Sequence, residues 1–178
     1  MPKAGSLADV GEIMQLAYLP ADFDAAIEYW TKTMGVGPFF MLENIRLGDM
    51  KYKGAPTDAV FSVAIAYWND MQIELVRPEN DAPAHYTGDH AVHDRVQHVC
   101  IVVDDIEEAY RACREAGAEI LVEGKVGKSG AVIYADPGAG PGGVVEYVKL
   151  DDGGAEFFEH MKACAADWDG SDPVRSIG

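Results

Sequence analysis

Apolar residues in the first half of the chain follow first the period of a strand and then that of a helix. Residues 12–20, EIMQLAYLP, predict a strand. Residues 21–35 predict a helix that begins after the N-cap candidate Asp22 and ends at Gly35. A polar excursion interrupts the strands that follow, and these are predicted at residues 38–44, 59–68 and 71–78. The predicted order is strand, helix and three strands.

The same order recurs in the second half. A strand and an amphipathic helix are followed by three strands, at residues 96–105, 106–117, 118–126, 129–137 and 142–150. Residues 154–168 predict a further helix, and the last ten residues predict a loose tail. The division is therefore an N-terminal tail at 1–11, a first module at 12–78, a linker and possible lid at 79–95, a second module at 96–150, and a C-terminal helix and tail at 151–178.

Four polar residues stand at matching positions of the two modules. An offset of 83 residues aligns the first strands and places Gln15 on His98. An offset of 72 residues aligns MQIELVRP with GVVEYVKL and places Glu74 on Glu146. Because both faces of these strands are mainly apolar, each strand is expected to be covered by its helix on one side and to face a shared cavity on the other.

Two carboxylates in one cavity need compensation. A buried carboxylate costs several kcal/mol or becomes neutral, and two of them repel each other. A divalent cation would balance both charges, with Gln15 and neutral His98 completing a set of three oxygens and one nitrogen. Such a set leaves positions open for a substrate, as a catalytic metal requires.

Structural roles for the same residues remain open. A glutamate on an edge strand commonly points into water, and a strand histidine is commonly a hydrogen-bonded core residue. The paired placement in two modules favours the metal site over these alternatives. His85, His90 and His93 of the linker are interpreted as solvated loop residues rather than as a second cluster.

Composition narrows the function classes. The chain has 178 residues and a formal net charge of −16, which argues against nucleic-acid binding and disfavours anionic membranes. No apolar run approaches the length of a membrane span, and the N-terminal residues do not resemble a signal peptide. Three widely spaced cysteines are typical of reduced thiols, so a cytoplasmic protein is expected.

The chain resembles the vicinal oxygen chelate superfamily, the group of glyoxalases, bleomycin resistance proteins and extradiol dioxygenases. The resemblance covers residues 12–150 and is carried by DAAIEYW, EEAYRAC, QIELV, QHVCIVVDD and VVEYV. It implies an α+β fold in which two βαβββ modules form a curled mixed sheet around a metal-binding cavity. It also implies that the metal ligands are Gln15, Glu74, His98 and Glu146.

This ligand set is most similar to that of glyoxalase I. Methylmalonyl-CoA epimerase has His first and Gln second, so the present sequence departs from it at two of four positions. Glyoxalase I has an arginine and an asparagine four residues after its first and second ligands, where this chain has Leu19 and Pro78. These departures make glutathione doubtful as a co-substrate.

The resemblance implies an enzyme that abstracts a proton next to a metal-bound carbonyl, through an enolate or enediolate, as an isomerase, epimerase or lyase. Glu146 is the first choice of base, and Glu74 would return the proton. The expected partners are a divalent Zn, Ni, Co, Mn or Fe ion, a small carbonyl substrate and a second copy of the chain. A non-catalytic drug-sequestering protein and an Fe(II)-dependent dioxygenase are the alternatives.

Overall fold

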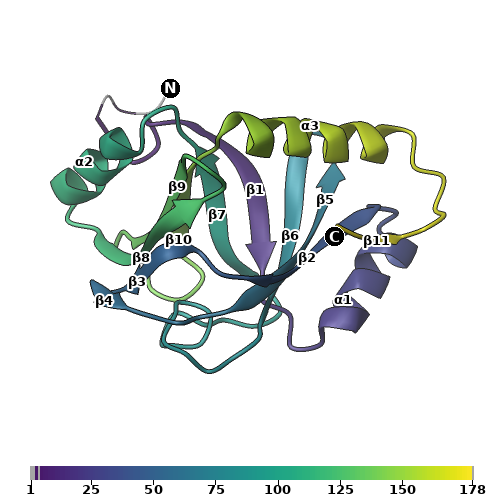
Figure 1. The fold of residues 1–178 in the computed structure, drawn as a ribbon, viewed down its shortest axis with the longest axis horizontal. Helices are drawn as coiled ribbons and strands as arrows, with labels where there is room; N and C mark the ends of the chain where they lie inside the picture. Colours follow the sequence, from purple (N-terminus) through teal and green to yellow (C-terminus); the bar gives the residue numbers. More distant parts are fainter. Residues whose placement is uncertain (1–2, 4, 178) are drawn as a thin grey trace.

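A computed structural model describes residues 3 and 5–177 and has the expected α+β architecture (Figure 1). In the described chain, eleven strands form one mixed sheet in the order β11-β2-β5-β6-β1-β7-β10-β9-β8-β3-β4. The sheet does not close into a complete barrel, because β11 and β4 are its two edges. The first strands of the two modules, β1 and β7, pair antiparallel at its centre.

The first module follows the predicted order. Its elements are β1 (Glu12–Tyr18), α1 (Phe23–Glu28) continued by the short π-helix η1 (Tyr29–Thr33), β2 (Phe39–Ile45), β5 (Phe61–Trp68) and β6 (Met71–Pro78). The side chain of Asp22 accepts a hydrogen bond from the backbone N–H of Ala25, so it is the N-cap that the sequence predicted.

The second module repeats this order. Its elements are β7 (Val96–Val102), α2 (Ile106–Ala116), β8 (Glu119–Val126), β9 (Gly130–Asp136) and β10 (Val144–Lys149). Helix α2 begins at the N-cap Asp105 and ends at Gly117, whose positive φ of 70° suits a residue without a Cβ. A further helix, α3 (Asp152–Ala166), crosses the first module beside β5 (Figure 1).

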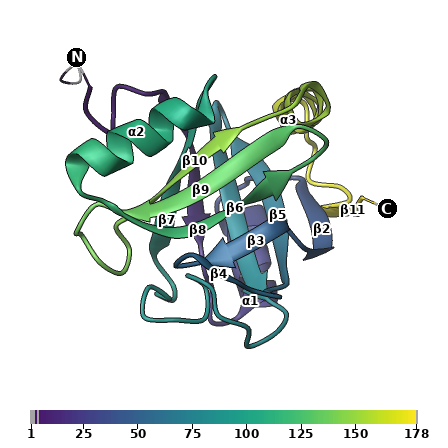
Figure 2. The ribbon, with the colours of Figure 1, turned by 60° about the vertical axis from the view of Figure 1, so that its left-hand side comes forward.

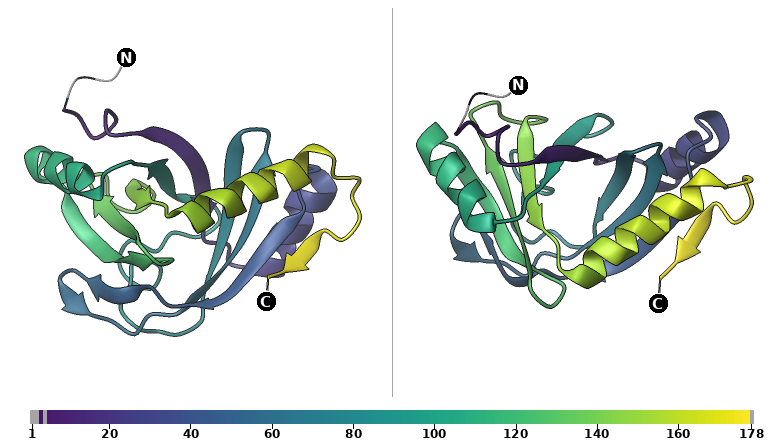
Figure 3. Two further views of the ribbon diagram at one scale, coloured as in Figure 1. Left: turned by 45° about the horizontal axis from the view of Figure 1, so that its top comes forward. Right: turned by 90° about the horizontal axis from the view of Figure 1, so that it is seen from above.

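The helices α1 and α2 cover the outer face of the sheet at opposite ends (Figure 3). Apolar residues of α1 and α2 pack against the outward-facing residues of their own modules. The inner face of the first module packs against Phe157, Phe158 and Met161 of α3. The inner face is therefore the side on which the two modules can share a cavity.

The polar excursion between β2 and β5 forms strands that the sequence did not predict. It contains β3 (Gly48–Tyr52) and β4 (Ala55–Pro56), and β3 pairs with β8 of the second module (Figure 2). Ion pairs between Lys51 and Glu123, 2.8 Å, and between Lys125 and Asp49, 2.5 Å, accompany this pairing. One chain segment thus joins the outer strands of both modules.

The expectation of a loose C-terminal tail was wrong in part. Residues Val174–Ser176 form β11, which extends the sheet beside β2. The backbone N–H of Phe39 donates to the carbonyl of Pro173 at 2.8 Å, so the exposed edge of β2 gains a partner. None of the helices in the described part of the chain has the length and hydropathy that a membrane span requires.

The crossing of the β2–β3 segment over β8 depends on Gly124. A Cβ added there would lie 2.8 Å from Cβ of Leu47. We expect Gly124→Ala to lower the free energy of unfolding by about 1 kcal/mol, because the clash exceeds the entropic gain of alanine. Chemical denaturation measures this. Gly153→Ala is the control, since its Cβ would meet only a carboxylate oxygen at 3.7 Å in the first turn of α3, and it should be neutral or stabilising. Equal stability of both variants would contradict the packing argument.

Candidate metal and catalytic site

The register of the central strands brings the four predicted residues onto two neighbouring rows of the inner face. In one row, Gln15 of β1 lies opposite Cys100 of β7, which lies opposite Glu146 of β10. In the next row, Ala17 of β1 lies between Glu74 of β6 and His98 of β7. Because side chains two positions apart share a face, all of these point to the same side of the sheet.

Strand alternation explains why each glutamate turns inward. Ile73 and Leu75 flank Glu74 and pack on the outer face with residues of α1. Tyr147 follows Glu146 and packs with residues of α2. Since successive side chains point to opposite faces, burying these apolar neighbours under the helices forces both carboxylates into the interior.

Three of the four side chains meet directly. Nε2 of His98 lies 3.0 Å from Oε2 of Glu146 and 3.6 Å from Oε2 of Glu74. Hence the two carboxylate oxygens are no farther apart than the sum of these distances. All four residues are buried, and His98 has no exposed surface.

Three polar atoms of the site that could ligate a metal form no hydrogen bond with the described residues. They are Oε1 of Gln15, Oε2 of Glu74 and Nε2 of His98. Buried polar atoms are normally paired, since an unpaired one costs about 1–3 kcal/mol. Three unpaired atoms on one inner surface point to a missing positively charged partner.

Burial also shifts the pKa of Glu74. Desolvation, and then the nearby charge of Glu146, raises the pKa of Glu74 well above its ordinary value. Burial and the same two carboxylates raise the pKa of the Cys100 thiol, which lies in the row between Gln15 and Glu146. No ion pair among the described residues joins Glu74 or Glu146 to a lysine or arginine, so the two carboxyl groups lie close together without such compensation.

These contacts fit a divalent ion in their chemistry and spacing. Ligands about 2.1 Å from a metal and at right angles to each other lie about 3.0 Å apart, close to the spacing of His98 and Glu146. No group of three or more His, Cys, Asp and Glu side chains in residues 3 and 5–177 forms a finished metal-binding arrangement. The proposed set contains three such side chains and Gln15, so these side chains would have to move closer together around an ion.

Sequence reasoning missed two buried glutamines that support the site. The amide nitrogen of Gln15 donates to Oε1 of Gln72, and Nε2 of Gln72 lies 3.0 Å from the Tyr67 hydroxyl. Oε1 of Gln97 lies 2.7 Å from Nδ1 of His98. Both glutamines occupy apolar strands, the same signal that identified Glu74 and Glu146.

The linker at residues 79–95 packs against the site. His85 and His90 are buried, so their interpretation as solvated residues was wrong, whereas His93 is exposed. The ring of His85 stacks between Tyr86 and Tyr134, with ring centroids 3.7 and 4.0 Å away. Linker residues do not line the large cavity described below, so the linker lies behind the site and not across the cavity opening.

A cavity of about 1050 Å³ opens from the site. Its floor includes Gln15, Glu74 and Glu146, together with Cys100 and Tyr134. The walls are mainly apolar and come from both modules and α3, including Ile45, Leu47, Phe61, Val63, Ile65, Val126, Val132, Val148, Leu150, Phe157 and Phe158. Arg46, Lys125 and Lys128 also line the cavity. The cavity can therefore hold a molecule with an apolar body that meets the buried carboxylates at one place and these cations at another.

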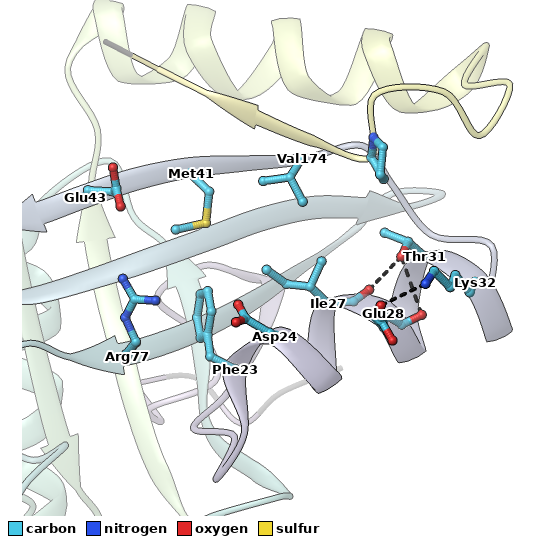
Figure 4. Close-up of a pocket in the computed structure, with 11 residues that line it drawn as sticks. Phe23, Asp24, Ile27, Glu28, Thr31, Lys32, Met41, Glu43, Arg77 and Val174 are labelled. Atoms are coloured by element: carbon cyan, nitrogen blue, oxygen red, sulfur yellow. Dashed lines mark hydrogen bonds and ion pairs between the residues drawn. The ribbon is translucent and has the colours of Figure 1, made fainter.

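A second groove of about 480 Å³ lies on the outer face, between α1, β2 and β11 (Figure 4). Arg77 stacks over the ring of Phe23 at 4.9 Å and pairs with Glu79 at 2.9 Å. The groove contains none of the four predicted site residues. The charged side chains of this groove are exposed or paired at the surface. The groove therefore differs from the inner cavity, where buried polar atoms lack a hydrogen bond.

The sequence of residues 14–134 matches the profile of the Glyoxalase/Bleomycin resistance protein/Dioxygenase superfamily. No curated protein matches the chain in sequence.

Solved structures share the fold at low identity. Methylmalonyl-CoA epimerase from Mycobacterium tuberculosis is 18% identical, with a TM-score of 0.58 over 88% of this chain and 97% of that one. A variant of the Streptomyces coelicolor epimerase bound to 2-nitronate-propionyl-CoA is 18% identical, with a TM-score of 0.59 over 80% and 96%. A hypothetical protein from Bacillus halodurans is 14% identical, with a TM-score of 0.55 over 80% and 96%.

The raised pKa of Glu74 predicts a pH-dependent effect in the metal-free protein. A folded-state pKa above the unfolded value means that the ionised group costs stability as pH rises through the folded pKa. Glu74→Gln should therefore be more stable than wild type at about pH 8, by roughly 1–3 kcal/mol, with the difference shrinking toward about pH 4.

Denaturation of chelator-treated protein across this pH range measures the effect. Glu43→Gln, which changes an exposed carboxylate on β2, is the control and should show no such trend. A Glu74→Gln variant that is less stable than wild type at every pH would mean that the carboxylate is already compensated.

Proposed function

Because the chain belongs to the Glyoxalase/Bleomycin resistance protein/Dioxygenase superfamily, we propose that it is a metal-dependent enzyme that moves a proton at the carbon next to a substrate carbonyl. The observation that carries this proposal is a set of three buried polar atoms without a hydrogen bond, on Gln15, Glu74 and His98. They lie beside the carboxylate of Glu146, the second carboxylate of the site. These four residues would hold the ion. When bound, it would polarise the carbonyl oxygen and stabilise the negative charge that develops there.

The two carboxylates serve proton transfer. Glu146 is proposed to take the proton from the carbon, and Glu74 to return it, because both lie at the floor of the cavity within reach of one bound molecule. If the proton returns to the opposite face of the same carbon, the configuration of that carbon is inverted, as an epimerase requires. If it returns to a neighbouring atom, the reaction is that of an isomerase or a glyoxalase-type lyase. The apolar walls exclude water and so strengthen these electrostatic interactions.

Epimerisation or isomerisation is the first choice within this class. Structural neighbours include methylmalonyl-CoA epimerases, one of them in complex with methylmalonyl-CoA. Their identity to this chain is low, so their substrate is not transferred. The cavity instead favours a carbonyl compound with an apolar body, given its size and walls.

Glutathione is a poor candidate as co-substrate. Leu19, which stands where glyoxalase I has an arginine, has no exposed surface and packs with Phe61, Val63 and Val76. A buried apolar residue offers no charge to a glutathione carboxylate. We therefore propose that the similarity to glyoxalase I is limited to the four metal ligands.

A non-catalytic binding protein is the second candidate. The large apolar cavity favours it, together with the lack of a finished metal-binding arrangement among the described residues. An Fe(II) dioxygenase needs two histidines and one carboxylate, whereas Gln15 stands where the first histidine would be.

The homodimer also stays a proposal, supported by the half-exposed Tyr29 and Trp68, which both contact Trp30.

Metal binding and C–H exchange test the enzyme proposal together. Purified wild type should bind one divalent ion per chain and exchange the carbon-bound proton of a 2-oxo aldehyde, hydroxy ketone or acyl thioester in deuterium oxide. Gln15→Ala and Glu146→Ala should lose the ion, and Glu146→Gln should lower exchange at least about 100-fold, the usual scale of one acid–base group. Mass spectrometry of the metal and NMR of the exchange are the measurements.

Asp24→Asn is the control, because Asp24 lines the outer groove and not the inner cavity (Figure 4). It should retain both the metal and the exchange. If wild type and Glu146→Ala bound metal equally, Glu146 would not be a ligand and the proposed metal site would be contradicted. A bound metal without exchange of any compound would favour the non-catalytic candidate.

A further inference from the structure

The side chain of Gln97 connects His98 to the backbone of the linker. Its Oε1 lies 2.7 Å from Nδ1 of His98, and its Nε2 lies 3.3 Å from the carbonyl oxygen of His90 and 3.5 Å from that of His85. Gln97 and His98 both have no exposed surface. Water therefore does not compete for these hydrogen bonds.

The chemistry of the groups fixes their orientation. Backbone carbonyl oxygens only accept hydrogen bonds, so the amide nitrogen of Gln97 must face the linker and its oxygen must face His98. That oxygen also only accepts, so Nδ1 of His98 must carry the proton. In a neutral imidazole the lone pair then lies on Nε2, which is 3.0 Å from a carboxylate oxygen of Glu146. That contact joins two acceptors, so it needs a cation, or a second proton on the ring, between them.

The opposite tautomer would be unfavourable here. It would place the lone pair of Nδ1 against Oε1 of Gln97, so two acceptors would face each other at 2.7 Å in a buried site. Rotation of the Gln97 amide would relieve this contact only by turning its oxygen toward the carbonyl oxygens of His85 and His90. The linker carbonyls therefore fix the orientation of the Gln97 amide, and the amide oxygen in turn fixes the proton on Nδ1 of His98.

The linker is anchored firmly enough for this role. Nε2 of His90 lies 2.9 Å from Oδ2 of Asp136, whose other oxygen accepts three backbone N–H bonds in the loop after β9. The Tyr86 hydroxyl lies 3.4 Å from that of Tyr134, which lines the cavity. On the other side, the backbone N–H of Asp94 donates to the carbonyl of Leu19, just after β1.

We propose that Gln97 is a positioning residue, through which the linker carbonyls at His85 and His90 hold His98 as the Nδ1–H tautomer and leave Nε2 free to bind a cation. The tautomer follows from the hydrogen bonds alone, whereas its consequence for metal binding rests on the proposed function. Groups that orient a ligating histidine in this way typically change metal affinity about 10–100-fold when they are removed.

The test compares two buried glutamines in the full-length protein. Gln97→Met removes the acceptor at Nδ1 with little change of volume. Gln72→Met is the matched control, because Gln72 is equally buried but bonds to Gln15 and not to His98.

The first measurement is the ¹⁵N NMR spectrum of His98 in histidine-labelled, metal-free protein, which shows whether Nδ1 carries a proton. Wild type and Gln72→Met should show a proton on Nδ1, and Gln97→Met should show a loss of that proton from Nδ1. The second measurement is competition titration with Zn²⁺, in which Gln97→Met should bind about 10–100-fold more weakly than wild type.

Two results would overturn the proposal. One is a wild-type protein in which Nδ1 of His98 carries no proton, a result that needs no variant to fold. The other is a Gln97→Met spectrum identical to that of wild type. A wild type that binds no Zn²⁺ while keeping the Nδ1–H form would contradict the proposed function but not the role of Gln97 in setting the tautomer.

Discussion

The close approach of two buried carboxylates to one imidazole nitrogen is the constraint on which the interior of this protein depends. Glu74 and Glu146 cannot both be ionised in an apolar cavity without a compensating positive charge, because desolvation and mutual repulsion act in the same direction. The outward packing of their neighbours under α1 and α2 prevents either from turning to solvent. The strands thus create an unfavourable charge arrangement that a bound cation would make favourable.

Segments outside the two repeated modules complete the surroundings of this arrangement. The β2–β3 segment joins both modules and contributes Leu47 to the cavity wall, while α3 contributes Phe157 and Phe158. The linker lies behind the site, where its backbone carbonyls hold Gln97. Only part of the site therefore comes from the repeat, and the cavity wall depends on segments that occur once in the chain.

Three solved structures share this fold at identities of 14–18%. At such identity the fold says little about the substrate, because function resides in the side chains placed on it. The residues that matter are the buried donors and the walls around them. Leu19 illustrates the point, since its burial in the core removes it from any role in binding a charged co-substrate.

The sequence by itself determined the repeated order of elements, the cap at Asp22, and the inward direction of Glu74 and Glu146. These follow from periods of 2 and 3.6 residues and from local capping, which need no knowledge of distant segments. Only the tertiary structure decided the burial of His85, the pairing of β3 with β8, the strand in the tail and the bond between Gln97 and His98. Each of these depends on which surface a polar or irregular segment meets, and residue patterns do not encode such long-range pairing because many polar segments could fill the same place.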